Sequence, residues 1–328
     1  MLNFFIPISS LLTFGIVYLY KDTIAKKFRL VDIPNKILKL HKNKTPIIGG
    51  LILLIHSISI LIFIFFNQKN YIEFFVLTIL ISILGLLDDI YKISPNKKIL
   101  ILTLFLSLFF IKFPQLKIGS LIIETLNYKF ILLEKNIFIN LIFTILCYLL
   151  IINAYNMSDG HDGIAVGLGL IWFLYILIFK SSSITIVLSI IIILILFFYY
   201  NIKSKIFLGD SGNYFISSLV AGLIINQNNY SKNFSAEEIF ILFMLPGIDM
   251  LRLFILRIYR KKNPFKGDRE HFHHYLSKKF NKITTTLIYL ACAIAPIILY
   301  KINLFKSYII IIFIISLYCL SLRFFLKK

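Results

Sequence analysis

The chain has 328 residues, of which 59% are hydrophobic and only 15% are charged, whereas a soluble domain is roughly half apolar and about a quarter charged. No long polar segment supplies a water-facing surface, so the composition argues against a soluble globular protein and predicts that lipid surrounds much of the chain. The net charge of +20 is explained by basic loops on one side of a membrane, and it does not require a nucleic-acid partner.

Apolar stretches recur along the whole chain, and each is long enough to cross a bilayer when tilt is allowed. They cover residues 1–20, 46–66, 71–87, 98–113, 136–152, 162–180, 183–200, 212–227, 238–257, 283–300 and 306–323. The stretch at 212–227 is the weakest because it is short and begins in a polar motif. We expect one all-α polytopic membrane domain over residues 1–328 with ten or eleven transmembrane helices. Strand-like runs within 114–135 predict a small β-hairpin.

Charge is distributed unevenly between the loops. Most of the 35 lysines and arginines lie in alternate loops, which predicts an N-terminus outside, a C-terminus in the cytoplasm and attraction of anionic membrane lipids to the inner face. All nine aspartates lie in or beside the segments expected to be cytoplasmic, whereas five of the six glutamates lie outside. Carboxylates near a membrane usually mark function. We therefore expect an active site on the cytoplasmic face and no ion path through the bilayer.

The first polar motif, LGLLDDIYKISPNKK, follows the third apolar stretch and contains Asp88 and Asp89. Adjacent carboxylates beside lipid repel each other, so the pair needs a divalent cation or a nearby lysine to neutralise it. Lys97 or Lys98 could supply that charge. A solvated helix end is the alternative interpretation of the pair taken alone.

The second motif, NAYNMSDGHDG at residues 153–163, concentrates two amides and two carboxylates beside glycines. Asp159 and Asp162 are three residues apart, so they would share a face on a helical turn. A simple polar connection would rarely gather Asn153, Asn156 and both aspartates. The motif therefore predicts a ligand-binding segment, in which His161 is a weaker candidate.

The third motif, KIFLGDSGN at residues 205–213, places Asp210 between glycines at the start of an apolar stretch. Free N–H groups at a helix N-terminus favour phosphate, and an aspartate there can instead hold Mg2+ that bridges phosphates. A glycine-bounded helix cap is the alternative. The motif lacks the lysine of a P-loop.

The fourth motif, NPFKGDREHFHHYL at residues 263–276, gathers one arginine and three histidines: Arg269, His271, His273 and His274. These cationic or hydrogen-bonding groups suit a diphosphate and the hydroxyls of uridine or a sugar. The alternative is a transition-metal site at the HFHH string. Near Pro46 and the following double glycine, His41 is a further candidate for the same face.

Five blocks occur in this order: VDIPNKILKLHKNKTPIIGG, LGLLDDIYK, NAYNMSDGHDG, KIFLGDSGN and NPFKGDREHFHHYL. Together they resemble the polyprenyl-phosphate N-acetylhexosamine-1-phosphate transferases, a family that includes the phospho-MurNAc-pentapeptide translocases. The HxHH form resembles the branch that forms undecaprenyl-linked GlcNAc for O-antigen, common-antigen and teichoic-acid carriers. Two departures concern the substrate: Asn213 follows the second glycine of GDSGN, where serine is more common, and the arginine common before the double glycine is missing.

The resemblance implies a reaction and its participants. A polyprenyl (undecaprenyl) phosphate would attack the sugar-linked phosphorus of a UDP-N-acetylhexosamine with Mg2+ or Mn2+ as cofactor, giving a polyprenyl diphosphate sugar and UMP in a bacterial inner membrane. It assigns catalysis to Asp88 and Asp89 and the metal to Asp210 with Asp89. The substrate-binding set is Asn153, Asn156, Asp159, Asp162, Arg269, His271, His273, His274, His41 and Lys98. A two-step route through a covalent aspartyl intermediate is equally compatible, and a homodimer is one candidate for the oligomeric state.

Three alternatives remain at this point. A phospho-MurNAc-pentapeptide transferase would use the same reaction class on another donor. A transporter or flippase of lipid-linked sugars would show ionisable residues along a path through the bilayer and often repeated halves, and the sequence shows neither. A degenerate membrane scaffold would not need the intact acidic and histidine motifs.

Overall fold

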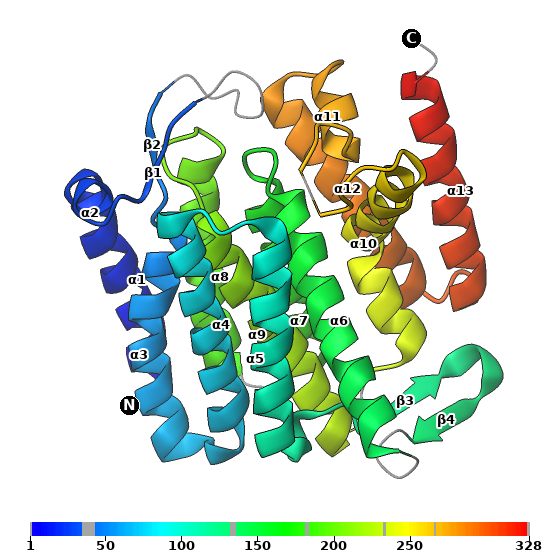
Figure 1. The fold of residues 1–328 in the computed structure, drawn as a ribbon. Helices are drawn as coiled ribbons and strands as arrows, with labels where there is room; N and C mark the ends of the chain where they lie inside the picture. Colours follow the sequence, from blue (N-terminus) through cyan, green and yellow to red (C-terminus); the bar gives the residue numbers. More distant parts are fainter. Residues whose placement is uncertain are drawn as a thin grey trace.

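A computed structural model of the chain describes residues 2–34, 43–131, 136–180, 184–231, 234–265 and 267–326. Within these residues, eleven helices of 17 or more residues form a bundle, and each overlaps one of the predicted apolar stretches (Figure 1). They are α1 (Leu2–Leu19), α3 (Gly49–Asn67), α4 (Ile72–Tyr91), α5 (Pro95–Lys112), α6 (Ile137–Ser158), α7 (Ile164–Lys180), α8 (Ile184–Asn201), α9 (Gly209–Ser231), α10 (Ala236–Tyr259), α12 (Lys282–Lys301) and α13 (Ser307–Leu326).

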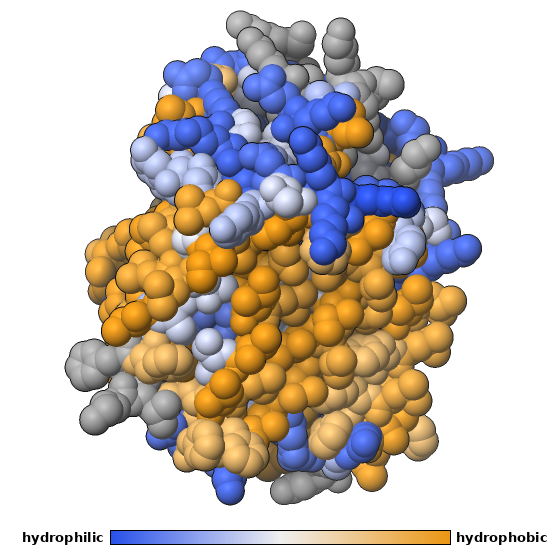
Figure 2. Space-filling view, turned by 90° about the vertical axis from the view of Figure 1, so that its left-hand side faces the viewer, coloured by the Kyte–Doolittle hydropathy of each residue, from blue (hydrophilic) through white to orange (hydrophobic). Residues whose placement is uncertain are grey.

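Seven of the helices in the described part of the chain have the length and apolar composition needed to cross a membrane. They are α3, α4 with the short turn before it, α6, α8, α10, α12 and α13. On the face drawn in Figure 2, apolar residues cover most of the middle of the molecule, with polar residues gathered above and below them. On α13, large side chains such as Ile312 and Phe313 are exposed. Side chains of this kind are stable outside a protein core when lipid surrounds them, so the chain is a multi-pass membrane protein.

The weakest predicted stretch, 212–227, forms the centre of the bundle as part of α9. This helix packs against α4, α3 and α6, and its middle residues, including Leu219 and Leu223, are fully buried. The side-chain amides in its final turns donate hydrogen bonds to backbone carbonyls of neighbouring loops. Asn228 Nδ2 donates to the Ser120 carbonyl at 2.8 Å, and Asn229 Nδ2 donates to the Lys117 carbonyl at 2.8 Å. The helix is less apolar than its neighbours because protein surrounds it instead of lipid.

Short elements connect the long helices. The hairpin predicted within 114–135 is confirmed, because β3 (Ser120–Ile123) pairs antiparallel with β4 (Tyr128–Ile131). The all-α prediction missed a second pairing, between β1 (Val31–Asp32) and β2 (Thr45–Pro46). The strands form because backbone N–H and C=O groups outside the helices still require partners. The remaining short helices are α2 (Lys21–Lys27), α11 (Phe272–Ser277), η1 (Lys69–Tyr71), η2 (Pro114–Leu116) and η3 (Glu124–Leu126).

The two ends of the bundle differ. The β3–β4 hairpin lies at one end, and β1, β2 and α11 lie at the opposite end (Figure 1). The last turn of α4 and the first turns of α5 and α9 also meet at this opposite end, which we call the site end because the polar motifs converge there. In Figure 1, α13 finishes at the site end.

Candidate active site

Two carboxylates and one lysine meet at the centre of the site end. Asp88 lies in the last turn of α4, Asp210 in the first turn of α9 and Lys98 in the first turn of α5. The Lys98 ammonium contacts Asp88 and lies 2.5 Å from Oδ2 of Asp210. Lys92 ends α4 in a left-handed conformation (φ 53°), and the chain then turns back toward α4 as α5. Of the two predicted lysines, Lys98 is therefore the one that neutralises Asp88, and it does so together with Asp210, whereas Lys97 is exposed.

Asp89, the second member of the acidic pair, caps α9. Its Oδ1 accepts a hydrogen bond from the backbone N–H of Asp210 and its Oδ2 from that of Ser211, each at 3.0 Å. The close approach requires Gly209, which has φ +76° and whose missing methyl group would lie 2.7 Å from Oδ2 of Asp89. Ser82 fixes the same turn, because its hydroxyl lies 3.0 Å from the Ser211 carbonyl. A carboxylate at a helix N-terminus satisfies free N–H groups and the helix dipole.

The carboxylates at the site end are candidate ligands for a metal ion. Within the described ranges, no group of three or more His, Cys, Asp or Glu side chains is arranged to hold one. Mg2+, however, often takes only one or two carboxylates and completes its shell with water and substrate phosphate. Asp88 and Asp210 share the Lys98 ammonium and are carboxylates of this type. These residues therefore fit a Mg2+ ion shared with the substrate, and the role of Asp89 as a ligand stays a prediction.

The second motif reaches α9 through Asn213. The side-chain amide of Asn213 donates to Oδ1 of Asn156 at 2.9 Å and to Oδ2 of Asp159 at 2.8 Å. Burial raises the pKa of Asp159 to about 8 against the effect of the Asn213 hydrogen bond. Asn213 follows Asp210 by three residues and thus shares its helix face. The sequence marked Asn213 only as a departure from the family pattern, and this spacing was the available signal of its position.

Two other residues of the second motif, Asn153 and Asp162, have partners other than Asn213. The side chain of Asn153 donates to the backbone of its own helix at 2.7 Å. Asp162 forms an ion pair with Lys282 and accepts a hydrogen bond from Ser204 at 2.5 Å. The prediction that Asp159 and Asp162 share a helical face was wrong, because α6 ends before either residue and the chain turns between them. Asp162 instead joins the α6–α7 connection to the start of α12.

The histidine motif lies beside the second motif. His273 is fully buried, and a methyl group at Gly160 would lie 2.4 Å from its Nε2. Burial lowers the pKa of His273 well below its usual value and that of His274 to about 4. Both rings are therefore neutral near pH 7, so of the two predicted characters, cationic or hydrogen-bonding, only the second applies to these two histidines. Arg269 is half-buried, and its charge adds to the lowering of the His274 pKa after burial and His271. His41 lies outside the described residues.

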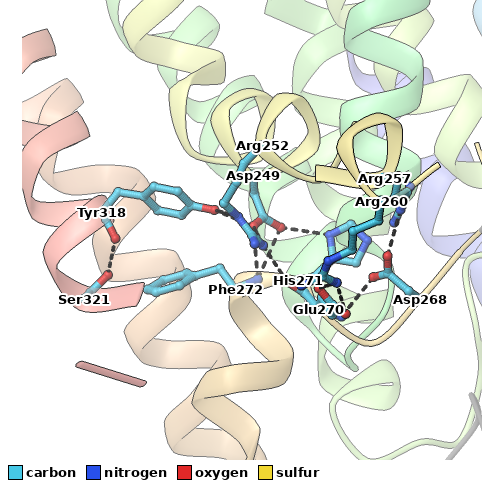
Figure 3. A network of polar contacts seen from close by, with 10 residues as sticks. All are labelled: Asp249, Arg252, Arg257, Arg260, Asp268, Glu270, His271, Phe272, Tyr318 and Ser321. Atoms are coloured by element: carbon cyan, nitrogen blue, oxygen red, sulfur yellow. Dashed lines mark hydrogen bonds and ion pairs between the residues drawn. The ribbon is translucent and has the colours of Figure 1, made fainter. Parts of the chain in front are cut away.

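The remaining histidine of the motif, His271, belongs to a different network. Its Nδ1 lies 2.8 Å from Oδ2 of Asp249 on α10 (Figure 3). In the same loop, Asp268 accepts a hydrogen bond from Arg257 at 2.7 Å. These aspartates hold the segment that precedes α11.

An apolar cavity of about 350 Å³ lies among α6, α7, α9 and α10. Along α6 it extends from Phe143 to Ala154, a distance of about 16 Å at the helical rise per residue. Ala154 belongs to the second motif, so the cavity extends along α6 as far as the start of that motif. A chain of apolar groups is the type of ligand that such a lining accommodates.

The chain is similar in sequence to known proteins over a region that includes Asp88, Asp89 and Asp210. The sequence model of glycosyl transferase family 4 matches residues 71–228, which contain α4 to α9 apart from the last residues of α9. The undecaprenyl-phosphate alpha-N-acetylglucosaminyl 1-phosphate transferase of Thermotoga maritima is 26% identical, covering 80% of this chain and 78% of the relative. The probable undecaprenyl-phosphate N-acetylglucosaminyl 1-phosphate transferase of Bacillus subtilis is 29% identical, covering 93% and 88%. The phospho-N-acetylmuramoyl-pentapeptide-transferase of Dictyoglomus turgidum is 29% identical, covering 80% and 85%. Over residues 71–228 the chain is therefore similar to glycosyl transferase family 4, and over most of its length it is similar to the two kinds of transferase named above.

Proposed function

We propose that the protein transfers GlcNAc-1-phosphate from UDP-GlcNAc to undecaprenyl phosphate, releasing UMP, and so forms the first lipid-linked sugar of a cell-envelope glycan. The observation that carries this proposal is the meeting of Asp88, Asp210 and Lys98 at the site end. The apolar cavity extends along α6 as far as Ala154 in the second motif. The named relatives from Thermotoga maritima and Bacillus subtilis support the same substrates. A lipid with an apolar chain and a phosphate head matches this combination of surfaces.

The proposed topology has all eleven long helices crossing the inner membrane of a bacterium. The site end would face the cytoplasm, and the N-terminus would lie outside. The loops at the site end carry most of the basic residues, and such loops remain on the cytoplasmic side. The strongly polar upper part of the molecule in Figure 2 supports this orientation.

The transfer step would join an oxygen of the lipid phosphate to the sugar-linked phosphorus. The bond from that phosphorus to the bridging oxygen of UMP breaks, and UMP leaves with the bonding electrons. Such a transfer depends mainly on positioning and charge neutralisation. Asp88 would orient the lipid phosphate, and Lys98 would balance the negative charges that gather between Asp88 and Asp210. A Mg2+ ion held by Asp210 with Asp88 or Asp89 would stabilise the developing charge on UMP.

The donor would bind where the second and fourth motifs meet. Asn156, Asp159 and Asn213 form one hydrogen-bonded group and would face the nucleotide. The neutral rings of His273 and His274 would donate hydrogen bonds to the diphosphate or the sugar, and the guanidinium of the half-buried Arg269 would add positive charge.

The test uses purified protein in lipid nanodiscs with undecaprenyl phosphate and radiolabelled UDP-GlcNAc, in Mg2+ or EDTA. We expect labelled lipid and an equal amount of UMP in Mg2+, and neither product from Asp210→Asn protein that inserts normally. UDP-MurNAc-pentapeptide is the competing donor, and preference for it would assign the protein to the reaction of the Dictyoglomus relative. Absence of labelled lipid with every UDP-N-acetylhexosamine would overturn the proposal and favour a transporter.

A further inference from the structure

Asp249 is a buried carboxylate of α10 that no proposed step uses. It is only 3% exposed. Its Oδ1 accepts hydrogen bonds from Tyr318 at 2.6 Å, from Nη2 of Arg252 at 2.9 Å and from the backbone N–H of Phe272 at 3.1 Å. Its Oδ2 lies 2.8 Å from Nδ1 of His271 (Figure 3). The carboxylate therefore connects α10, α13 and the segment before α11.

We propose that Asp249 is a positioning residue that keeps a proton on Nδ1 of His271 and leaves Nε2 as the nitrogen available to the sugar diphosphate. This inference rests on the proposed function and deepens it. An ionised carboxylate only accepts hydrogen bonds, so the imidazole nitrogen that faces it must carry hydrogen. The partner of one ring nitrogen thus decides which chemistry the other can perform.

The two oxygens of Asp249 have different tasks. Three donors bind Oδ1, while Oδ2 meets His271 and receives only a longer contact, 3.3 Å, from the N–H of Phe272. The Arg252 guanidinium balances the buried negative charge, and the Tyr318 hydroxyl fixes the rotation of the carboxylate. Removing the donor of either Arg252 or Tyr318 should therefore change the tautomer or orientation of the His271 ring, although neither donor binds that ring.

The backbone around His271 is held by the same groups. Arg252 Nη2 also donates to the carbonyl of Glu270 at 2.5 Å, and the N–H of Phe272 binds Asp249. The residues on both sides of His271 are thus fixed, together with its ring. Holding a reacting or binding group in one geometry is worth a large factor in rate, and a misplacement of about 1 Å costs about a hundredfold.

The neighbouring histidines differ from His271 in their hydrogen bonding. Within the described residues, both ring nitrogens of His273 and Nδ1 of His274 are buried without a hydrogen-bond partner. The His271 ring stacks on the His273 ring with centroids 5.3 Å apart and planes inclined by 8°. His271 is therefore the member of the motif whose tautomer the fold sets, and its orientation also supports the ring that lies against Gly160.

The experiment reads the tautomer directly. Full-length protein labelled with nitrogen-15 histidine is studied by NMR in nanodiscs at mildly alkaline pH without substrate, and His271→Gln assigns the signals. We expect the Nδ1–H tautomer in the wild type and the Nε2–H tautomer in Asp249→Asn, because the new amide can donate to Nδ1. Transferase activity should then fall about a hundredfold in kcat, with little change in KM.

Tyr318→Phe is the second variant, because it keeps the carboxylate and the packing of the ring. Loss of one donor to Oδ1 should lower kcat about tenfold and broaden or shift the His271 signals. Ser321→Ala is its matched control on the same helix, since the Ser321 hydroxyl donates only to the backbone carbonyl of Tyr318 at 2.7 Å, and it should behave as the wild type.

An Nε2–H tautomer in wild-type protein would overturn the inference. So would wild-type kcat in Tyr318→Phe together with unchanged His271 signals, even if Asp249→Asn fails to fold. The tautomer is measured without substrate, so an inactive wild type with the expected tautomer would count against the proposed function and not against the geometry.

Discussion

Asp89 accepts hydrogen bonds from two successive backbone N–H groups, and the first belongs to Asp210. One carboxylate of the acidic pair therefore positions the helix turn that carries the third carboxylate. The other carboxylate, on Asp88, shares Lys98 with Asp210. The adjacent aspartates thus act on the same turn in different ways, which makes their roles separable by mutation.

Asp89→Asn should destabilise the protein because the amide offers one acceptor oxygen where the carboxylate offers two. We expect a loss of about 1–2 kcal/mol in the free energy of unfolding, the usual value of a lost helix cap. Chemical denaturation in detergent measures it, and the loss should be equal in EDTA and in Mg2+. Asp22→Asn, at a side chain that is 68% exposed, is the control. A loss of stability confined to Mg2+ would show that Asp89 acts only as a metal ligand.

Lys98→Met should leave Asp88 and Asp210 facing each other without their shared cation. The two carboxylates, which both contact the Lys98 ammonium in the wild type, would then repel each other. We therefore expect a loss of activity at low Mg2+ that high Mg2+ partly restores. Lys97→Met removes an exposed lysine from the preceding position and should not change the Mg2+ dependence. Activity measured across a Mg2+ titration compares the two variants. Equal Mg2+ dependence in both would contradict the assigned role of Lys98.

The helices could be predicted from the sequence because a chain in lipid must satisfy its backbone hydrogen bonds internally. A helix was therefore the expected structure for each apolar stretch, and even the weak stretch at 212–227 is helical. A lysine contact to Asp88 was also predictable, since Lys97 and Lys98 follow it by only nine and ten residues, but the choice between these two lysines required the structure. The capping role of Asp89 was not predictable, because its partners lie 121 and 122 residues away along the chain.

The remaining differences between the predicted and observed site arise because several side chains bind partners that are distant in the sequence. Asp162 is near Asp159 in sequence, but the structure offers it Lys282 from α12, and an ion pair decides its direction. The neutral state of His273 follows from complete burial, which no local pattern reveals. Tyr318 lies in a helix that showed no polar motif, and its role depends on the packing of α13 beside α10.

The pKa of Asp159 predicts a pH dependence of stability. Burial raises it to about 8 from an ordinary value of 3.8, so the folded protein keeps a proton that the unfolded chain loses within this window. The unfolded state then binds fewer protons, and stability falls as pH rises from about 4 to about 8. Asp159→Asn should remove this decline, whereas Asp22→Asn should keep it. Unfolding in EDTA at both ends of the window measures the difference, and equal slopes in wild type and Asp159→Asn would contradict the prediction.

Asn213→Ser restores the residue more common in the family and tests whether this departure tunes donor binding. Serine is too short to reach both Asn156 and Asp159, which now share the Asn213 amide at 2.9 and 2.8 Å. Because each hydrogen bond contributes about 1 kcal/mol, we expect KM for UDP-GlcNAc to rise about tenfold with a smaller change in kcat. Ser217→Ala, one turn further along α9 and bonded only to its own helix backbone, is the control. A fall in kcat with unchanged KM would instead place Asn213 in support of Asp210, because both residues lie on the same face of α9 and a shift of that turn would move the carboxylate.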